Sequence, residues 1–244
     1  MFFRTGLPRR RLLWLSVLLL LPLLAALAYR LSGEGEGSAW FRETAVPMFV
    51  EFFALGLSLY LGVASLADEI EDGTIVFLFC RPVPRGLVLL AKVVAVIGVA
   101  GIGLSASLLL VFLGCHLPDG DALWAAAPLL VRVLGVLWLE VLVYTGLFSL
   151  AGSLLRRPML LSIIFGFGWE VTASHLPGDL PRLTLMFYLR SLLGLSPGAE
   201  NMLSSLVPPL PPADAATALA VLLSAAGVFI SLAAWIIGRR EYRL

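Results

Sequence analysis

Residues 68–92 read DEIEDGTIVFLFCRPVPRGLVLLAK and form the polar interruption around which the rest of this chain is arranged. Four acids open the stretch and a short apolar run follows. Two arginines and the only lysine of the protein, Lys92, come after that run. Long apolar segments lie on both sides of it, so the interruption predicts a loop between two membrane-spanning helices.

The composition of the whole chain supports a membrane location. Of the 244 residues, 60% are hydrophobic and 14% are charged, and the mean hydropathy is +0.98. A soluble domain has roughly 45–50% apolar and about 25% charged residues, so the excess indicates lipid as the solvent. Two cysteines are too few for a disulfide framework.

Six segments are long and apolar enough to cross a bilayer core of about 30 Å as helices. We therefore predict an all-α polytopic membrane protein with six transmembrane helices in a single domain, residues 1–244. The third and fourth segments are longer than one crossing requires, which indicates tilt or interfacial extensions. The six segments are Leu12–Tyr29, Pro47–Leu66, Leu87–Cys115, Ala127–Leu155, Met159–Ser174 and Ala215–Ile237.

The positive charges predict the orientation. With the N-terminus inside, twelve of the seventeen lysines and arginines fall in cytoplasmic segments, as the positive-inside rule requires. We predict a multi-pass protein of the bacterial cytoplasmic membrane with both termini in the cytoplasm. Residues 68–85 then lie on the cytoplasmic side and residues 177–212 outside.

Three segments outside the spans have their own predictions. Residues 1–11 are either a segment lying on the inner leaflet or a disordered basic flank. Ser32–Glu43 is expected to be an external loop. Residues 177–212 are expected to hold one amphipathic helix on or partly inside the outer leaflet. Its apolar positions are Leu183, Met186, Leu189 (or Tyr188), Leu192 and Leu193, and its polar positions are Arg182 and Arg190.

Four ionisable side chains, Glu51, Arg132, Glu140 and Glu170, fall inside the predicted spans. Charged groups are costly in hydrocarbon, so Arg132, Glu140 and Glu170 are each expected to face a partner or a watery cavity. Glu51, about one turn inside the outer end of its span, is either interfacial and solvated or functional. In one interpretation, ion pairs such as Arg132 with Glu170 or Glu51 hold the helices together. In the other, these side chains line a transport pathway.

No motif for an enzyme is visible. Because Lys92 is the only lysine, the chain lacks a GxxxxGK[ST] phosphate loop, and it has neither HExxH nor GxSxG. Cys115, His116, Asp119 and Asp121 are residue types that bind metals, but adjacent Cys and His match no ligand spacing and Pro-Asp-Gly is typical of a turn. We predict a turn, no metal site and no enzyme.

Within the interruption, the run Ile75–Cys80 is predicted to form a short helix. Thr74 is a good N-cap for the run Ile75–Cys80, and Pro82 and Pro84 prevent its continuation. The run is too apolar to stay bare in the cytoplasm, so it is expected to dock on a partner or to pack under the helices.

The interruption resembles the coupling region of ABC-2 type transporter permeases, with the pattern E-x-E-x-G-T-L-x-x-L-L-x-R-P-V-x-R and a lysine seven residues later. Ile75 and Phe79 replace leucines of that pattern, and Pro84 is additional. Trp169-Glu170, Leu176-Pro177-Gly178, Leu183-Thr184 and Tyr188–Leu192 are similar to one branch of these permeases. The matching residues of the interruption are Glu69, Glu71, Gly73, Thr74, Ile75, Leu78, Phe79, Arg81, Pro82, Val83, Arg85 and Lys92.

The resemblance implies a membrane subunit that pairs with a second permease copy, identical or related, and with two separate ATPase subunits. Residues 74–80 would be the coupling helix in a groove of the ATPase, anchored by Phe77 or Phe79. ATP and Mg would bind the ATPase, so no cofactor is expected on this chain. Membrane lipids and, in one version, a periplasmic protein are further partners, and no nucleic acid is expected.

Three functions follow from these observations. The first is the permease of an ATP-driven exporter whose substrate the sequence does not specify. The second is a non-transporting module that passes ATP-driven motion to a periplasmic partner or an assembly machine, for example in metal-site maturation. The third is an ion-coupled carrier that uses Glu51, Glu140 and Glu170, which leaves the interruption unexplained.

Overall fold

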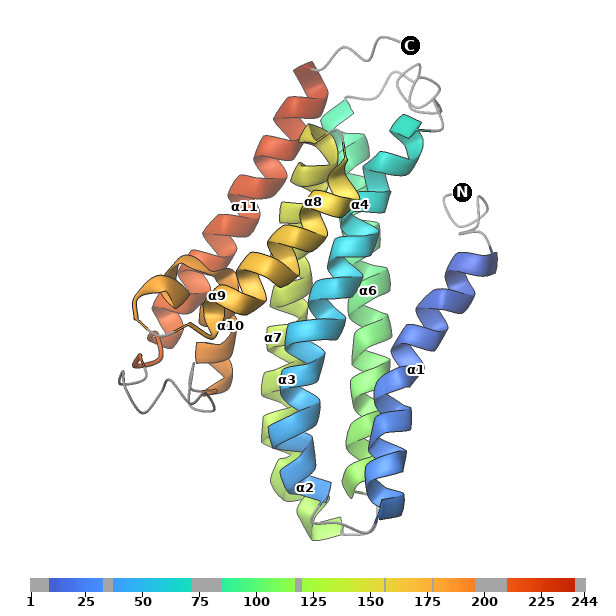
Figure 1. Ribbon diagram of the computed structural model, residues 1–244, viewed down its shortest axis with the longest axis vertical. Coiled ribbons are helices and arrows are strands. Elements are labelled where there is room, and N and C mark those ends of the chain that lie inside the picture. Colours follow the sequence, from blue (N-terminus) through green and yellow to red (C-terminus); the bar gives the residue numbers. More distant parts are fainter. Residues whose placement is uncertain are drawn as a thin grey trace. The chain divides into compact units, whose positions relative to one another are not determined.

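The computed structural model describes residues 9–32, 37–71, 85–116, 120–155, 157–176, 178–195 and 210–239, and every regular element in these ranges is a helix (Figure 1). The all-α prediction is confirmed. Within these ranges four helical segments are long and apolar enough to cross a membrane, namely Gly37–Ser65, Gly86–His116, Asp121–Leu154 and Ala215–Arg239. Two shorter apolar helices, Val17–Leu31 and Pro158–Ser174, fall in the first and fifth predicted spans.

The long helices are joined by short helical pieces, some with π or 3-10 geometry. α6 and α7 have 32 and 35 residues, so each is about 50 Å long, well above the roughly 30 Å of a bilayer core. The elements are α1 (Arg9–Ser32), α2 (Gly37–Trp40), η2 (Phe41–Ala45), α3 (Val46–Met48), η3 (Phe49–Ala54), α4 (Leu55–Glu71), α6 (Arg85–His116), α7 (Gly120–Leu154), α8 (Pro158–Ile163), η4 (Ile164–Val171), α9 (Thr172–Ser174), η5 (Leu180–Leu183), α10 (Leu185–Leu193) and α11 (Ala215–Arg239).

The chain divides into two compact units, residues 1–53 with 102–134 and residues 54–101 with 135–244. In the first unit, α1 is joined to the second half of α6 by two hydrogen bonds. Ser107 Oγ donates to the carbonyl of Leu19 over 2.5 Å, and Arg30 Nη1 donates to the carbonyl of Gly114 over 2.6 Å. These bonds satisfy polar groups that would otherwise be exposed to hydrocarbon.

The predicted external loop Ser32–Glu43 is wrong in its second half, because the chain is helical from Gly37 onward. Phe41 and Ala45 are buried, whereas the polar residues between them are exposed. The Phe41 ring packs edge-on against Phe112 of α6, with the ring centres 5.3 Å apart. One apolar side of this turn is therefore covered by packing, which the GEGEGS composition before it did not indicate.

In the second unit, α11 packs against α6 and α7. Leu89 and Val93 of α6 form a buried cluster with Ala233 and Ile237 of α11. α7 approaches α11 at Gly146, where an added Cβ would lie 3.0 Å from Ile230 Cγ1. Small residues permit such close contacts between membrane helices, where packing rather than the hydrophobic effect stabilises association.

Another close contact, between α4 and α7, supports a stability prediction. A Cβ added to Gly62 would lie 3.0 Å from the Phe148 Cβ and 3.4 Å from the Thr145 carbonyl oxygen. Gly62→Leu is therefore expected to push the helices apart and lower the unfolding free energy by about 2 kcal/mol. Gly98→Leu is the control, since no heavy atom lies within 4 Å of its added Cβ. Thermal unfolding of both variants tests this prediction, and equal melting temperatures would contradict it.

The single amphipathic helix predicted within residues 177–212 is also different in the structure. Leu183 belongs to the 3-10 turn η5 and is 70% exposed, and α10 begins only at Leu185. Arg190, placed at a polar position by the sequence, is 8% exposed. In Figure 1, α10 lies beside α11, with which it packs.

Most of the predicted coupling region lies outside the described residues. α4 ends at Glu71 and α6 begins at Arg85, so the backbone at Glu69, Glu71 and Arg85 is helical. Residues 72–84 are not among those described, and neither are residues 1–8. The predicted helix Ile75–Cys80 and the two predictions for residues 1–11 stay untested.

Candidate functional site

A buried carboxylate, Glu170, joins three elements of the second unit. It belongs to the π-helical stretch η4 and is only 2% exposed. Its Oε2 accepts hydrogen bonds from the Tyr144 hydroxyl (3.0 Å), the Leu185 amide (2.9 Å) and the Met186 amide (3.2 Å). Helices η4, α7 and α10 therefore meet at a single oxygen atom.

Glu170 and Thr184 together cap α10. Thr184 has extended backbone geometry (φ −100°, ψ 145°), and its Oγ1 accepts from the Phe187 amide over 3.2 Å. The first three amides of α10 thus all have acceptors. The amides of Leu185 and Met186 share the Glu170 oxygen of η4, and the Phe187 amide bonds Thr184. A carboxylate is favourable at this position because the N-terminus of a helix carries partial positive charge. At the other end, Gly194 adopts a left-handed conformation (φ 72°) that ends the helix.

A second contact holds the last turn of α10. Arg190 Nη1 donates to His175 Nε2 over 3.0 Å, so that nitrogen carries a lone pair. His175 Nδ1 lies 2.7 Å from the Val171 carbonyl and is then the nitrogen that carries the hydrogen. His175 follows directly after α9. We call Tyr144, Glu170, His175 and Arg190 the α10 clamp. Glu170 holds the first turn of α10, His175 holds its last turn through Arg190, and Tyr144 bonds the same Glu170 oxygen from α7.

The other three predicted intramembrane residues have different surroundings. Glu140 is fully buried on α7, one turn before Tyr144. Glu51 is half-buried in the π-helical stretch η3, and Arg132 is exposed on α7. Glu170 Oε2 is bound by a hydroxyl and two amides, and the predicted ion pairs of Arg132 stay a prediction.

Sequence reasoning identified Glu170 but missed Tyr144, His175 and Arg190. Arg190 was read as a surface residue because its neighbours alternate at helical spacing. The sequence signal was that leucines stand at 189 and 193, and the structure shows that both are buried. An arginine among buried leucines requires a nearby acceptor, which is the ring nitrogen of His175.

Lys92 forms a hydrogen bond between the two helices that flank the predicted coupling region. Its side chain is 8% exposed, and its Nζ donates to the carbonyl of Ser65 over 2.9 Å. Ser65 lies on α4 and Lys92 on α6, the two helices that flank the interruption. The only lysine of the chain therefore joins these two helices.

Of the residues considered as metal ligands, His116 is buried in an aromatic contact. His116 is 2% exposed, its Nδ1 lies 2.9 Å from the Phe112 carbonyl, and its ring stacks on that of Phe112. Within the described ranges, no three His, Cys, Asp or Glu side chains come together as metal ligands would. Asp119 lies outside those ranges.

The apolar helices and the polar groups buried among them define a helical membrane protein. The ABC-2 family transporter protein family matches residues 7–170, which is more than half of the chain. The chain belongs to this family, whose members are transmembrane permeases of ABC transporters and are not themselves the ATPases. A search of curated proteins found no match.

Proposed function

We propose that this chain is the membrane subunit of an ATP-driven ABC-2 exporter, with six spans and both termini in the cytoplasm of a bacterium. A second permease copy and two ATPase subunits, which bind ATP and Mg, complete the transporter. The family match over residues 7–170 carries this proposal. The coupling pattern at residues 69–92 supports the ATPase partner.

Contacts within the second unit suggest how motion would travel from the ATPase. The coupling region connects α4 to α6, and Lys92 bonds the two helices at its base. α4 packs on the helix Pro158–Ser174, where the Cβ position of Gly166 is 3.4 Å from Leu59 Cδ1. That helix holds α10 through the clamp. A push on residues 74–80 would therefore move α4, then the Pro158–Ser174 helix, and α10 with it.

The intramembrane ionisable residues have separate roles in this proposal. Glu51, Arg132 and Glu140 are assigned to the transport pathway. Glu170 is a structural anchor, because its Oε2 already accepts three hydrogen bonds. An ion-coupled carrier would need this carboxylate to bind and release an ion during each cycle, so the structural role of Glu170 favours the ATP-driven function.

Co-purification tests the proposal. The tagged chain is expressed with the ATPase encoded nearest to it and purified in mild detergent. We expect the ATPase to be retained and its ATP hydrolysis in proteoliposomes to depend on the permease. Recovery of the chain without any ATPase, from its native membrane as well, would overturn the proposal.

A further inference from the structure

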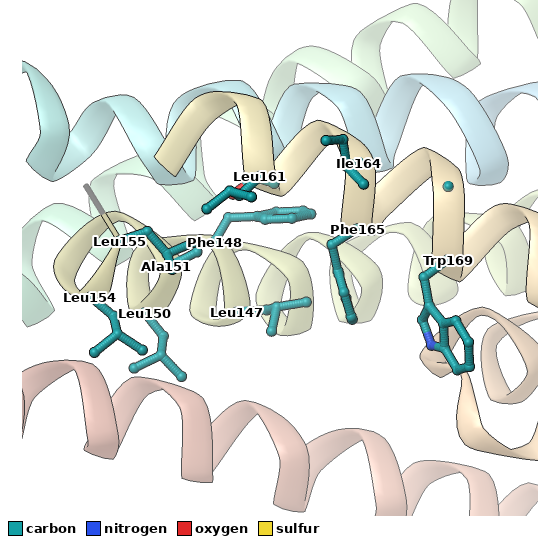
Figure 2. A pocket seen from close by; sticks show the side chains of 12 residues that line it. Leu147, Phe148, Leu150, Ala151, Leu154, Leu155, Leu161, Ile164, Phe165 and Trp169 are labelled. Atoms are coloured by element: carbon teal, nitrogen blue, oxygen red, sulfur yellow. The ribbon is translucent and has the colours of Figure 1, made fainter. Parts of the chain in front are cut away.

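An apolar groove of about 900 Å³ lies between the last turns of α7 and the helix formed by α8 and η4. Leu147, Phe148 and Leu150 of α7 form one wall, and Leu161, Phe165 and Trp169 form much of the other (Figure 2). The volume is within the range of small-molecule sites, roughly 300–1,000 Å³. Apolar cavities disfavour water and bind apolar molecules.

One polar residue lines the groove, and a charged residue directly precedes the helix that forms one of its walls. Ser162 lines it, is 2% exposed, and its hydroxyl has no hydrogen-bond partner among the described residues. Arg157 has an exposed side chain and immediately precedes α8. Five residues of helix separate Arg157 from Ser162, or about 7.5 Å along the axis. Trp169 lies about 10 Å further on.

This order of groups is complementary to a glycerophospholipid. A phosphate at the helix end would meet the guanidinium of Arg157. The glycerol ester would then lie deeper, at the level of Ser162, a polar residue among the apolar ones that line the groove. Beyond Ser162 the described walls are apolar as far as Trp169, as an acyl chain requires. An indole at the end of such a chain is amphipathic and tolerates a partly polar environment.

We propose that this groove binds one anionic glycerophospholipid, with its phosphate at Arg157, its ester at Ser162 and an acyl chain along Phe148 and Phe165 toward Trp169. The lipid fills the space between α7 and the Pro158–Ser174 helix, the element that holds α10. This site needs only the membrane location and does not depend on an ATPase partner.

Native mass spectrometry of the delipidated full chain tests the site. The probes are phosphatidylglycerol and phosphatidylcholine with identical acyl chains. We expect one retained lipid per chain and an approximately fivefold preference for phosphatidylglycerol, since one basic side chain near the surface contributes about that factor. Arg157→Gln should remove the preference. Arg239→Gln, at an exposed arginine at the end of α11, should keep it.

A second variant tests the apolar part of the groove. Ala151 lines the groove, so Ala151→Phe is expected to fill it and prevent retention of both lipids. Val228→Phe, on the exposed side of α11, should leave retention unchanged. Equal retention of both lipids by the unmodified chain, or full retention by Ala151→Phe, would overturn the site. A dimer that retains no lipid would also overturn it, because a second copy would then cover the groove.

Discussion

Replacing Glu170 by alanine is expected to release the first turn of α10 and to lower the unfolding free energy by about 3–5 kcal/mol. The Tyr144 hydroxyl and the amides of Leu185 and Met186 would lose their acceptor. A buried donor without a partner costs roughly 1–3 kcal/mol, and the loss of a charged acceptor is at the upper end. Most single substitutions lower the unfolding free energy by only about 0.5–3 kcal/mol.

Hydrogen exchange of the peptide that contains Leu185 and Met186 measures the local part of this effect. A local loss of about 2.7 kcal/mol raises exchange of these amides roughly a hundredfold. Peptides from α6 should change much less. A uniform rise across all helices would show general loosening and would contradict a specific role of Glu170 at α10.

Tyr144→Phe is the matched control for the same carboxylate. It removes one donor to Glu170 and leaves both α10 amides bonded. The expected cost is about 1 kcal/mol, and exchange at Leu185 and Met186 should rise by less than tenfold. If Tyr144→Phe and Glu170→Ala gave the same exchange rates, the α10 amides would not be what Glu170 stabilises.

Replacing both Phe77 and Phe79 by aspartate is expected to abolish co-purification of the ATPase. The run Ile75–Phe79 is apolar, and the proposed function places it in a groove of the partner. Burying an ionised carboxylate without a partner costs several kcal/mol. Two such groups would weaken the complex by at least a thousandfold, at about 1.4 kcal/mol per tenfold.

Pull-down and stimulated ATP hydrolysis measure this second effect. The double variant Leu176→Asp and Leu183→Asp is the control, because it adds the same charges at exposed leucines outside the interruption. The control should retain the ATPase. Unchanged recovery and hydrolysis with aspartate at Phe77 and Phe79 would remove the coupling role from residues 74–80.

The helical class and the positions of the long helices were predictable from the sequence. Runs of about 20 apolar residues have one stable form in lipid, because a helix satisfies its own backbone hydrogen bonds. The interruption at residues 68–85 was identified in the same way, and its resemblance to ABC-2 permeases agrees with the family match. Glu170 was identified as unusual because an acid in an apolar segment requires an explanation.

The partners of the buried groups depended on the tertiary structure. The oxygen of Glu170 is bound by amides 15 and 16 residues later in the chain, and backbone amides leave no signal in a sequence. The sequence placed Arg190 at a polar helix position and Phe41 in an external loop, but both side chains are buried. The apolar runs alone therefore determined that this chain forms membrane helices, because lipid imposes that requirement on each segment separately. Only packing between segments decided that α10 is held by Glu170 and His175, because a hydrogen bond between helices depends on where both of its ends lie.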